Sequence, residues 1–225
     1  MEQRHGGREQ PLTARAVIFS KGTYANSAGV AARLRDDDWL VCADGALAHL
    51  VDLQLWPDLL VGDFDSVSLD LLAAAKARGV DIITFPPEKD YTDTELAWQE
   101  VRQRGYRQIL VVGGWGGRLD HSLANLLLFA PYAEQGYRIC LTDGTTDAYF
   151  VTDELALERC QDKLVSIIAV TPTAQGVTAR GFRWPLAEAD FHWGQGLGIS
   201  NIPIADTVSV QVRQGILLVV VTPED

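Results

Sequence analysis

Up to about residue 150, short apolar runs recur along the chain with helix-like segments between them. The runs are rich in valine, isoleucine and leucine and do not alternate cleanly with polar residues. This pattern is typical of strands that are buried on both faces, as in a parallel sheet. The expected strands cover residues 16–20, 39–42, 58–62, 81–85, 108–114 and 137–143.

Helical patterns fill the gaps between these runs, at residues 45–55, 68–79, 92–105 and 120–136. In the third helix, Thr92 and Glu95 have the spacing of a capping box, and Gly105 is a typical helix stop. The fourth is expected to end or kink at Pro131, which cannot donate a backbone hydrogen bond. Strands that alternate with helices predict a doubly wound, mostly parallel α/β domain.

After about residue 150 the apolar runs follow one another with no room for helices. Val208, Val210 and Val212 alternate with polar residues, which predicts a strand that is exposed on one face. Residues 209–221 are predicted to form a hairpin that turns near Gln214 and Gly215. We therefore expect a disordered leader at 1–14, an α/β domain at 15–150 and a smaller all-β sandwich domain at 151–225. The β-rich runs cover residues 154–158, 163–170, 176–182, 206–214 and 215–222.

Composition narrows the possible partners. The formal net charge of −11 argues against nucleic acid and against an anionic membrane surface, because both favour basic proteins. No apolar stretch approaches the roughly 20 residues that span a bilayer. The polar N-terminus lacks the apolar core of a secretory signal. Three widely spaced cysteines without a C-x-x-C motif suit a reduced, cytoplasmic setting.

Acidic residues follow several of the predicted strands. In an open parallel sheet, ligands bind at the carboxyl ends of the strands, so these acids are expected to meet at one edge. A glycine-rich turn, "GGWGGRLDH", follows the strand at 108–114. The strand-end residues with candidate chemistry are Asp44, Asp63, Asp65, Asp90, Asp93, Arg118, Asp120 and His121.

Each of these features has an ordinary structural explanation. A D-x-D pair can be a turn or a helix cap, and Asp93 can simply favour a helix N-terminus. The glycine-rich segment can be a flexible loop, and His121 can be structural. Their coincidence points elsewhere, because an uncompensated acid cluster is costly. Carboxylates suit Mg²⁺, glycine amides can approach phosphate oxygens, and Arg118 can pair with phosphate, so we expect a metal–nucleoside triphosphate site.

Two common nucleotide-binding motifs are absent. Nothing in the sequence has the P-loop pattern G-x-x-x-x-G-K-[ST], and the glycine-rich turn is not G-x-G-x-x-G. Neither a P-loop kinase nor a dinucleotide-dependent dehydrogenase is therefore supported.

Several blocks together resemble the thiamine pyrophosphokinase family. They are "CADGALAHL", "VGDFDS", "EKDYTDTELA", "GGWGGRLDHSLANLLL", "GFRWPL" and "GLGISN", spread over roughly residues 40–202. The resemblance implies an α/β catalytic domain, a β-sandwich domain and a homodimer with active sites between the subunits. It also implies transfer of the pyrophosphoryl group of ATP to the hydroxyl of thiamine, which releases AMP.

The resemblance also implies roles for individual residues. Asp63 and Asp65 become the leading Mg²⁺ ligands with Asp93, and Asp44 lies nearby in support. Asp120, with His121, is placed near the thiamine hydroxyl, and its carboxylate is our candidate general base. The segment "IPI" after "GISN" departs from many relatives, which carry an acidic residue and then an aromatic one there. The implied ATP-binding residues are Asp44, Lys89, Asp90, Thr92, Arg118 and His121, and the implied thiamine-binding residues are Trp184, Ser200 and Asn201.

Two other functions fit parts of the sequence. A phosphatase of the haloacid-dehalogenase type also carries a D-x-D after an apolar strand, but it needs neither the glycine-rich turn nor a β-sandwich. A non-enzymatic thiamine-binding module would not need the strand-end acids, all of which stand in their motif contexts here.

Overall fold

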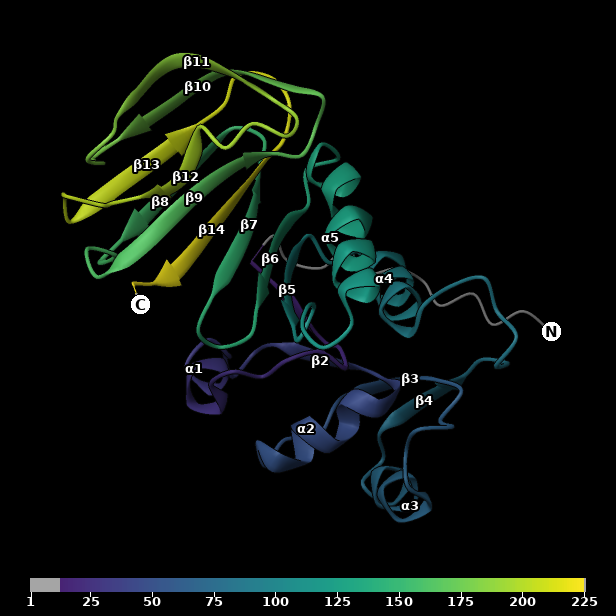
Figure 1. The fold of residues 1–225 in the computed structure, drawn as a ribbon. Helices are drawn as coiled ribbons and strands as arrows, with labels where there is room; N and C mark the ends of the chain where they lie inside the picture. The colour runs from purple at the N-terminus through teal and green to yellow at the C-terminus, as the bar shows by residue number, and fades with distance from the viewer. Residues whose placement is uncertain (1–12, 225) are drawn as a thin grey trace. The chain divides into compact units, whose positions relative to one another are not determined.

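The structure is a computed structural model that describes residues 13–224 (Figure 1). The leader expected at 1–14 lies outside the described residues except for its last two positions. The chain divides into two compact units. The first contains residues 13–128 and Thr142–Gly144, and the second contains Phe129–Leu141 and residues 145–224.

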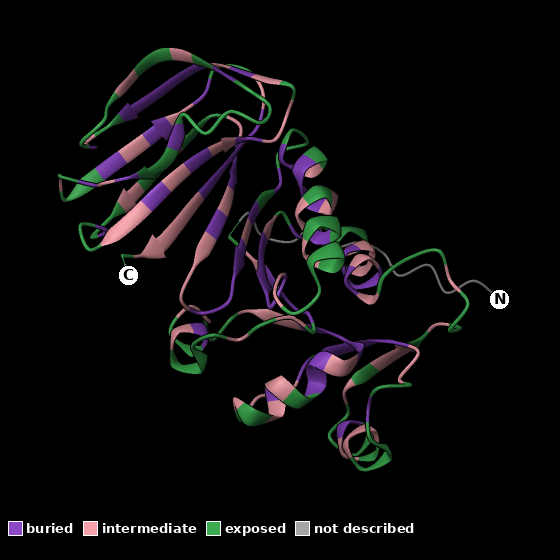
Figure 2. Cartoon of the chain, in the orientation of Figure 1, coloured by how far each residue is buried: buried purple, intermediate pink, exposed green. Residues whose placement is uncertain are grey.

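A parallel sheet forms the centre of the first unit, with the strand order β5-β1-β2-β3-β4. Most residues of β1, β3 and β5 are buried, as the continuous apolar runs predict (Figure 2). β4 lies at the end of this order and is partly exposed. The strands are β1 (Arg15–Phe19), β2 (Trp39–Ala43), β3 (Leu59–Gly62), β4 (Asp81–Thr84) and β5 (Gln108–Val112).

The order of the strands sets the faces on which the helices lie. The chain steps from β1 to β4 in one direction and then returns across the sheet to β5. Because such crossovers are right-handed, α4 lies on the opposite face from α1, α2 and α3, as Figure 1 shows. The direction reverses between β1 and β5, which makes this the switch point of a doubly wound sheet. The helices are α1 (Ser27–Ala31), α2 (Leu47–Asp52), α3 (Leu69–Ala77), α4 (Asp93–Gln103) and α5 (Leu119–Ala133), with a 3₁₀ turn η1 (Asp44–Ala46) before α2.

The predicted helix signals are largely confirmed. Thr92 is the N-cap of α4, where its hydroxyl accepts a hydrogen bond from the backbone N–H of Glu95 at 3.2 Å. Helix α5 continues past Pro131 and ends at Ala133. The sequence pattern did not predict the short helix α1.

Strands from two sheets form the second unit: β12-β9-β14-β7-β6 are successive neighbours in one sheet, and β11-β10-β13-β8 form a separate four-stranded sheet. Buried side chains from both sheets, such as Ile167 of β9 and Val210 of β13, belong to one apolar cluster. This sandwich and the first unit confirm the predicted fold class. Its strands are β6 (Arg138–Thr142), β7 (Asp147–Val151), β8 (Glu154–Glu158), β9 (Lys163–Ala169), β10 (Thr173–Arg180), β11 (Leu186–His192), β12 (Gly198–Asn201), β13 (Thr207–Gln211) and β14 (Leu217–Pro223).

The hairpin predicted for residues 209–221 is wrong. β13 pairs with β8 and β10 in the four-stranded sheet, whereas β14 pairs with β7 and β9 in the other sheet. The segment between β13 and β14 is hydrogen-bonded to Gln175 of β10 instead, where the backbone N–H of Arg213 donates to the Gln175 carbonyl at 3.0 Å. The chain therefore crosses from one sheet to the other at Gln214. Strands β7, β11 and β12 were also not predicted as separate elements.

Among residues 13–224, no helix has the length and apolar character that crossing a membrane requires.

Candidate active site

A cavity of about 580 Å³ opens at the carboxyl ends of the parallel strands. Its walls come from the segments that follow β1, β2, β3, β4 and β5, all within the first unit. Segments 20–22 and 113–118 leave β1 and β5 on either side of the switch point and face each other across it. The cavity therefore lies where ligands bind in doubly wound sheets.

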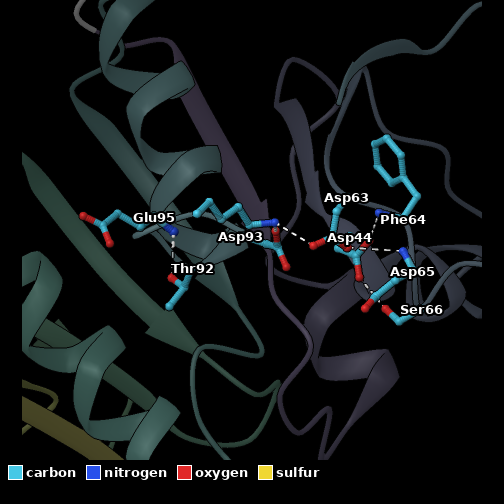
Figure 3. A network of polar contacts seen from close by, with 9 residues as sticks. Asp44, Asp63, Phe64, Asp65, Ser66, Thr92, Asp93 and Glu95 are labelled. Carbon is cyan, nitrogen blue, oxygen red and sulfur yellow. Dashed lines mark hydrogen bonds and ion pairs between the residues drawn. The ribbon is translucent and has the colours of Figure 1, made fainter. Parts of the chain in front are cut away.

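Three carboxylates from two strand ends form the acidic part of this cavity. Asp44, Asp63 and Asp65 each offer a carboxylate oxygen, and these oxygens lie within 4.8 Å of one another. Figure 3 shows the three side chains next to each other. Asp44 is buried and accepts hydrogen bonds from the backbone N–H of Phe64 at 2.9 Å and from the Ser66 hydroxyl. These bonds hold the Asp44 carboxylate in place beside the other two acids.

The backbone around this cluster has unusual conformations. Asp44 has a φ of 41° and Phe64 has a φ of 64°, both in the left-handed region that non-glycine residues rarely adopt. Such residues cost about 1–3 kcal/mol each and are found where function requires a defined geometry. Gly62 is needed for two reasons, because its φ is 156° and because a Cβ atom there would lie 2.7 Å from Cβ of Asp44. The local backbone is thus shaped around the Asp44 carboxylate.

Lys89 links two of the acids. Its Nζ atom lies 2.9 Å from Oδ2 of Asp63 and 2.8 Å from Oδ1 of Asp93. The hydrogen bond from Lys89 lowers the pKa of Asp63, and the bond from the Asp65 N–H adds to this effect. Burial raises the pKa of Asp93, although its pairing with Lys89 opposes the rise. Burial acts to lower the pKa of Lys89, but its bonds to Asp93 and Asp63 outweigh that effect and raise it overall.

The glycine-rich turn after β5 forms the wall opposite the acids. Gly116 has a φ of 102°, and a Cβ atom there would lie 1.8 Å from Oγ1 of Thr23, so only glycine fits. Two residues of α5 hold the turn: the Asn125 amide donates to the Gly114 carbonyl at 2.8 Å, and Ser122 Oγ accepts from the Gly116 N–H at 3.0 Å. The glycine-rich turn, whose amides were predicted to approach phosphate oxygens, is therefore held in place as part of the cavity wall.

Arg118 and Asp120 form an exposed ion pair at the cavity rim. Both Nε and Nη2 of Arg118 donate to the Asp120 carboxylate. This pairing lowers the pKa of Asp120 to about 2. Arg118 and His121 line the cavity, whereas Asp120 and the exposed Asp90 do not. In this conformation Asp120 is a poor proton acceptor.

Comparisons with known proteins identify the family of the chain. The model of the thiamin pyrophosphokinase catalytic domain matches residues 30–141, and the model of the thiamin pyrophosphokinase vitamin B1 binding domain matches residues 153–217. The chain belongs to the thiamine pyrophosphokinase family. The two matched domains correspond to the α/β and β-rich parts of the chain. The haloacid-dehalogenase-type alternative is left without support.

Relatives and solved structures of the thiamine pyrophosphokinase family match most of the chain. Thiamine pyrophosphokinase from Bacillus subtilis is 27% identical over 179 residues, which cover 79% of this chain and 84% of that protein. Its crystal structure superposes with a TM-score of 0.84 at 24% identity, covering 94% of this chain and 100% of that one. Thiamin pyrophosphokinase from Geobacillus thermodenitrificans gives a TM-score of 0.80 at 26% identity, covering 94% and 98%.

The region matched by the vitamin B1 binding domain contains the predicted thiamine-binding residues. The indole of Trp184 is largely exposed, and the Arg183 guanidinium lies 5.7 Å from its centroid. Asn201 is buried, and its amide is occupied by backbone groups. Its Nδ2 donates to the Trp184 carbonyl at 2.7 Å, and its Oδ1 accepts from the N–H of Trp184 at 3.2 Å and of Ile202 at 3.0 Å. Asn201 therefore positions the backbone of Trp184. Ser200 is exposed, with a φ of 55°.

The close acid triad differs from the metal set that the family motif implies. Asp44, expected only in support, belongs to the triad, whereas Asp93 pairs with Lys89 instead. Several other cavity residues were not predicted at all, among them Lys21, Ser66 and the buried pair Ser20 and Thr94, whose hydroxyl oxygens are 2.9 Å apart. Ser66 lies in the "GDFDS" block, and Lys21 follows the first predicted strand. The position of each residue after a predicted strand could therefore have identified it as a site residue.

Proposed function

We propose that this protein is a Mg²⁺-dependent thiamine pyrophosphokinase that converts ATP and thiamine to thiamine pyrophosphate and AMP. The observation that carries this proposal is that the acid triad and the glycine-rich turn face one cavity at the switch point of the sheet. The family match to both a catalytic and a vitamin B1 binding domain supports the choice of substrates.

The donor set of the triad fits Mg²⁺. Asp44, Asp63 and Asp65 supply only hard carboxylate oxygens, which Mg²⁺ prefers over nitrogen and sulfur ligands. We assign these three residues to the metal, with Asp93 near enough to Asp63 to share Lys89. When bound, Mg²⁺ supplies charge neutralisation for a polyphosphate.

The protein's own groups can hold the triphosphate opposite the acids. The glycine-rich turn, Arg118, His121 and Lys21 all line the cavity. Arg118 can pair with phosphate through two parallel hydrogen bonds. Thr92 lines the same cavity, and Asp90 is assigned to the nucleotide from the motif alone. These contacts would align the β-phosphorus with the incoming hydroxyl, which is the main requirement of such transfers.

In the second unit, Trp184 is the proposed aromatic surface for thiamine. The thiazolium ring is cationic, and an exposed indole can contribute a cation–π interaction of about 0.5–2 kcal/mol. Asn201 would hold the backbone of Trp184, and Ser200 would contact the ligand directly.

Asp120 remains the proposed general base, on one condition. Its carboxylate is held by Arg118, so it gains proton affinity only when Arg118 turns to phosphate. Nucleotide binding would then prepare the base for the thiamine hydroxyl.

We also propose a homodimeric, cytoplasmic protein. Dimerisation rests on the family resemblance. None of the three cysteines, all of which lie among the described residues, forms a disulfide bond, which fits a reducing compartment.

The deciding experiment is incubation with thiamine, ATP and Mg²⁺, followed by identification of both products by chromatography and mass spectrometry. We expect equimolar thiamine pyrophosphate and AMP. Stoichiometric ADP would make the protein an ordinary kinase. Thiamine binding without any consumption of ATP would make it a binding module.

A further inference from the structure

Lys89 occupies a special place among the acids of the cavity. Its ammonium group contacts Asp63 on the loop after β3 and Asp93 at the start of α4, at 2.9 and 2.8 Å. Its side chain is only 11% exposed, so water screens these contacts weakly. Lys89 thus joins two segments that are distant in the sequence.

The same Asp63 carboxylate also belongs to the triad with Asp44 and Asp65. Its Oδ1 accepts from the Asp65 N–H at 3.2 Å, and its Oδ2 accepts from Lys89. A divalent cation at the triad would therefore share Asp63 with an ammonium ion. Because like charges repel, Lys89 weakens the hold of the triad on a bare cation.

A triphosphate would change this balance. Lys89 lines the same cavity as the glycine-rich turn and Arg118, so a triphosphate bound in this cavity would bring negative charge into the surroundings of its ammonium group. A lysine is a compact charge on a flexible stem and can exchange one oxygen partner for another. Phosphate would also add negative charge next to the metal, which offsets the repulsion.

We propose that Lys89 is a built-in counter-ion that disfavours uptake of a bare divalent cation and couples metal binding to the arrival of the triphosphate. This inference rests on the proposed metal and nucleotide site. It assigns Lys89 a role in the nucleotide-free protein, in addition to phosphate contact.

Binding of Mn²⁺ to the nucleotide-free protein tests the proposal, with free Mn²⁺ measured by electron paramagnetic resonance. Lys89→Met should bind Mn²⁺ about tenfold more tightly than the wild type, which corresponds to about 1.4 kcal/mol. Lys89→Arg keeps the charge and should bind as weakly as the wild type. Lys76→Met removes the same charge from the exposed face of α3 and should also match the wild type. If Lys89→Met loses the native circular dichroism spectrum, Lys89→Gln replaces it.

A second measurement tests the coupling. Mn²⁺ should strengthen the binding of a non-hydrolysable ATP analogue more in the wild type than in Lys89→Met, because the coupling between two ligands is reciprocal. If Lys89→Met or Lys89→Gln bound Mn²⁺ with the same affinity as the wild type, the proposed role of Lys89 would be overturned, while the metal assignment would stand. Absence of bound Mn²⁺ in every variant, with and without the analogue, would refute the metal assignment and this inference with it.

Discussion

Replacement of Gly62 by alanine is expected to displace Asp44 and to reduce turnover. A Cβ atom at residue 62 would lie 2.7 Å from Cβ and 3.0 Å from Oδ1 of Asp44, whereas ordinary contacts begin near 3.4 Å. Asp44 has little room to yield, because it is buried and both of its carboxylate oxygens accept hydrogen bonds. The carboxylate must therefore move by several tenths of an ångström, together with the loop that holds it.

The expected size of the effect follows from this overlap. Overpacking of this kind costs about 1–3 kcal/mol of unfolding free energy. A displacement on the order of 1 Å at a reacting centre can cost about 100-fold in rate, so we expect kcat to fall roughly ten- to hundredfold. Initial rates of AMP formation at saturating substrates measure kcat, and urea unfolding measures the stability.

Gly79→Ala is the matched control. Gly79 has a φ of 79°, but a Cβ atom there meets nothing within 4 Å, and the residue follows α3 away from the cavity. This variant should lose about 1–2 kcal/mol of stability through backbone strain alone and keep its turnover. If a folded Gly62→Ala protein turned over as fast as Gly79→Ala, the proposed dependence of catalysis on the position of Asp44 would be refuted.

Three further predictions concern other parts of the proposed site. Asp65→Asn should lower kcat by at least about 100-fold, because it removes a proposed Mg²⁺ ligand. Its free energy of unfolding should stay within about 0.5 kcal/mol of the wild-type value, because Asp65 is exposed. Normal activity in this variant would contradict the metal assignment. Asn201→Ala should raise the KM for thiamine about three- to tenfold and leave the KM for ATP unchanged. The substitution removes both hydrogen bonds from the Asn201 amide to the backbone of Trp184. An equal rise in both KM values would indicate a general loss of structure. The pKa of Asp120, followed by NMR, should rise from about 2 towards its ordinary value of 3.8 in Arg118→Ala. Because the folded-state pKa is the lower one, the ion pair stabilises the wild type above the ordinary pKa, and this contribution is lost as the pH falls towards 2. A pKa unchanged by that substitution would remove Arg118 as its cause.

Local sequence patterns were sufficient to predict most elements of the first unit. The apolar runs at 16–20 and 108–114 became β1 and β5, and Thr92 caps α4 as its spacing with Glu95 predicted. These features depend on side-chain periodicity and on hydrogen bonds between residues close in the chain, so the local sequence is enough to predict them. The convergence of Asp44, Asp63, Asp65 and Asp93 on one cavity was also predictable, because parallel strands place their carboxyl ends at one edge, whereas Asp90 and Asp120 do not line it.

Partner choice in the β-rich unit was not predictable in this way. The runs that became β13 and β14 are joined by a short polar segment that suits a hairpin, yet each strand pairs in a different sheet. A strand's own sequence shows which face is buried, but not which neighbour accepts its hydrogen bonds.

The finer chemistry of the site also arises only from the tertiary structure. The motif blocks named Asp63, Asp65 and Asp93 as a set, but the fold brings Asp44 into the close triad and places Lys89 between Asp63 and Asp93. Likewise, "GISN" identified Asn201 without indicating that its amide would bind the backbone of Trp184. Sequence order specifies which groups reach the edge of the sheet, whereas distances of a few ångströms between groups on separate segments depend on how the whole chain packs.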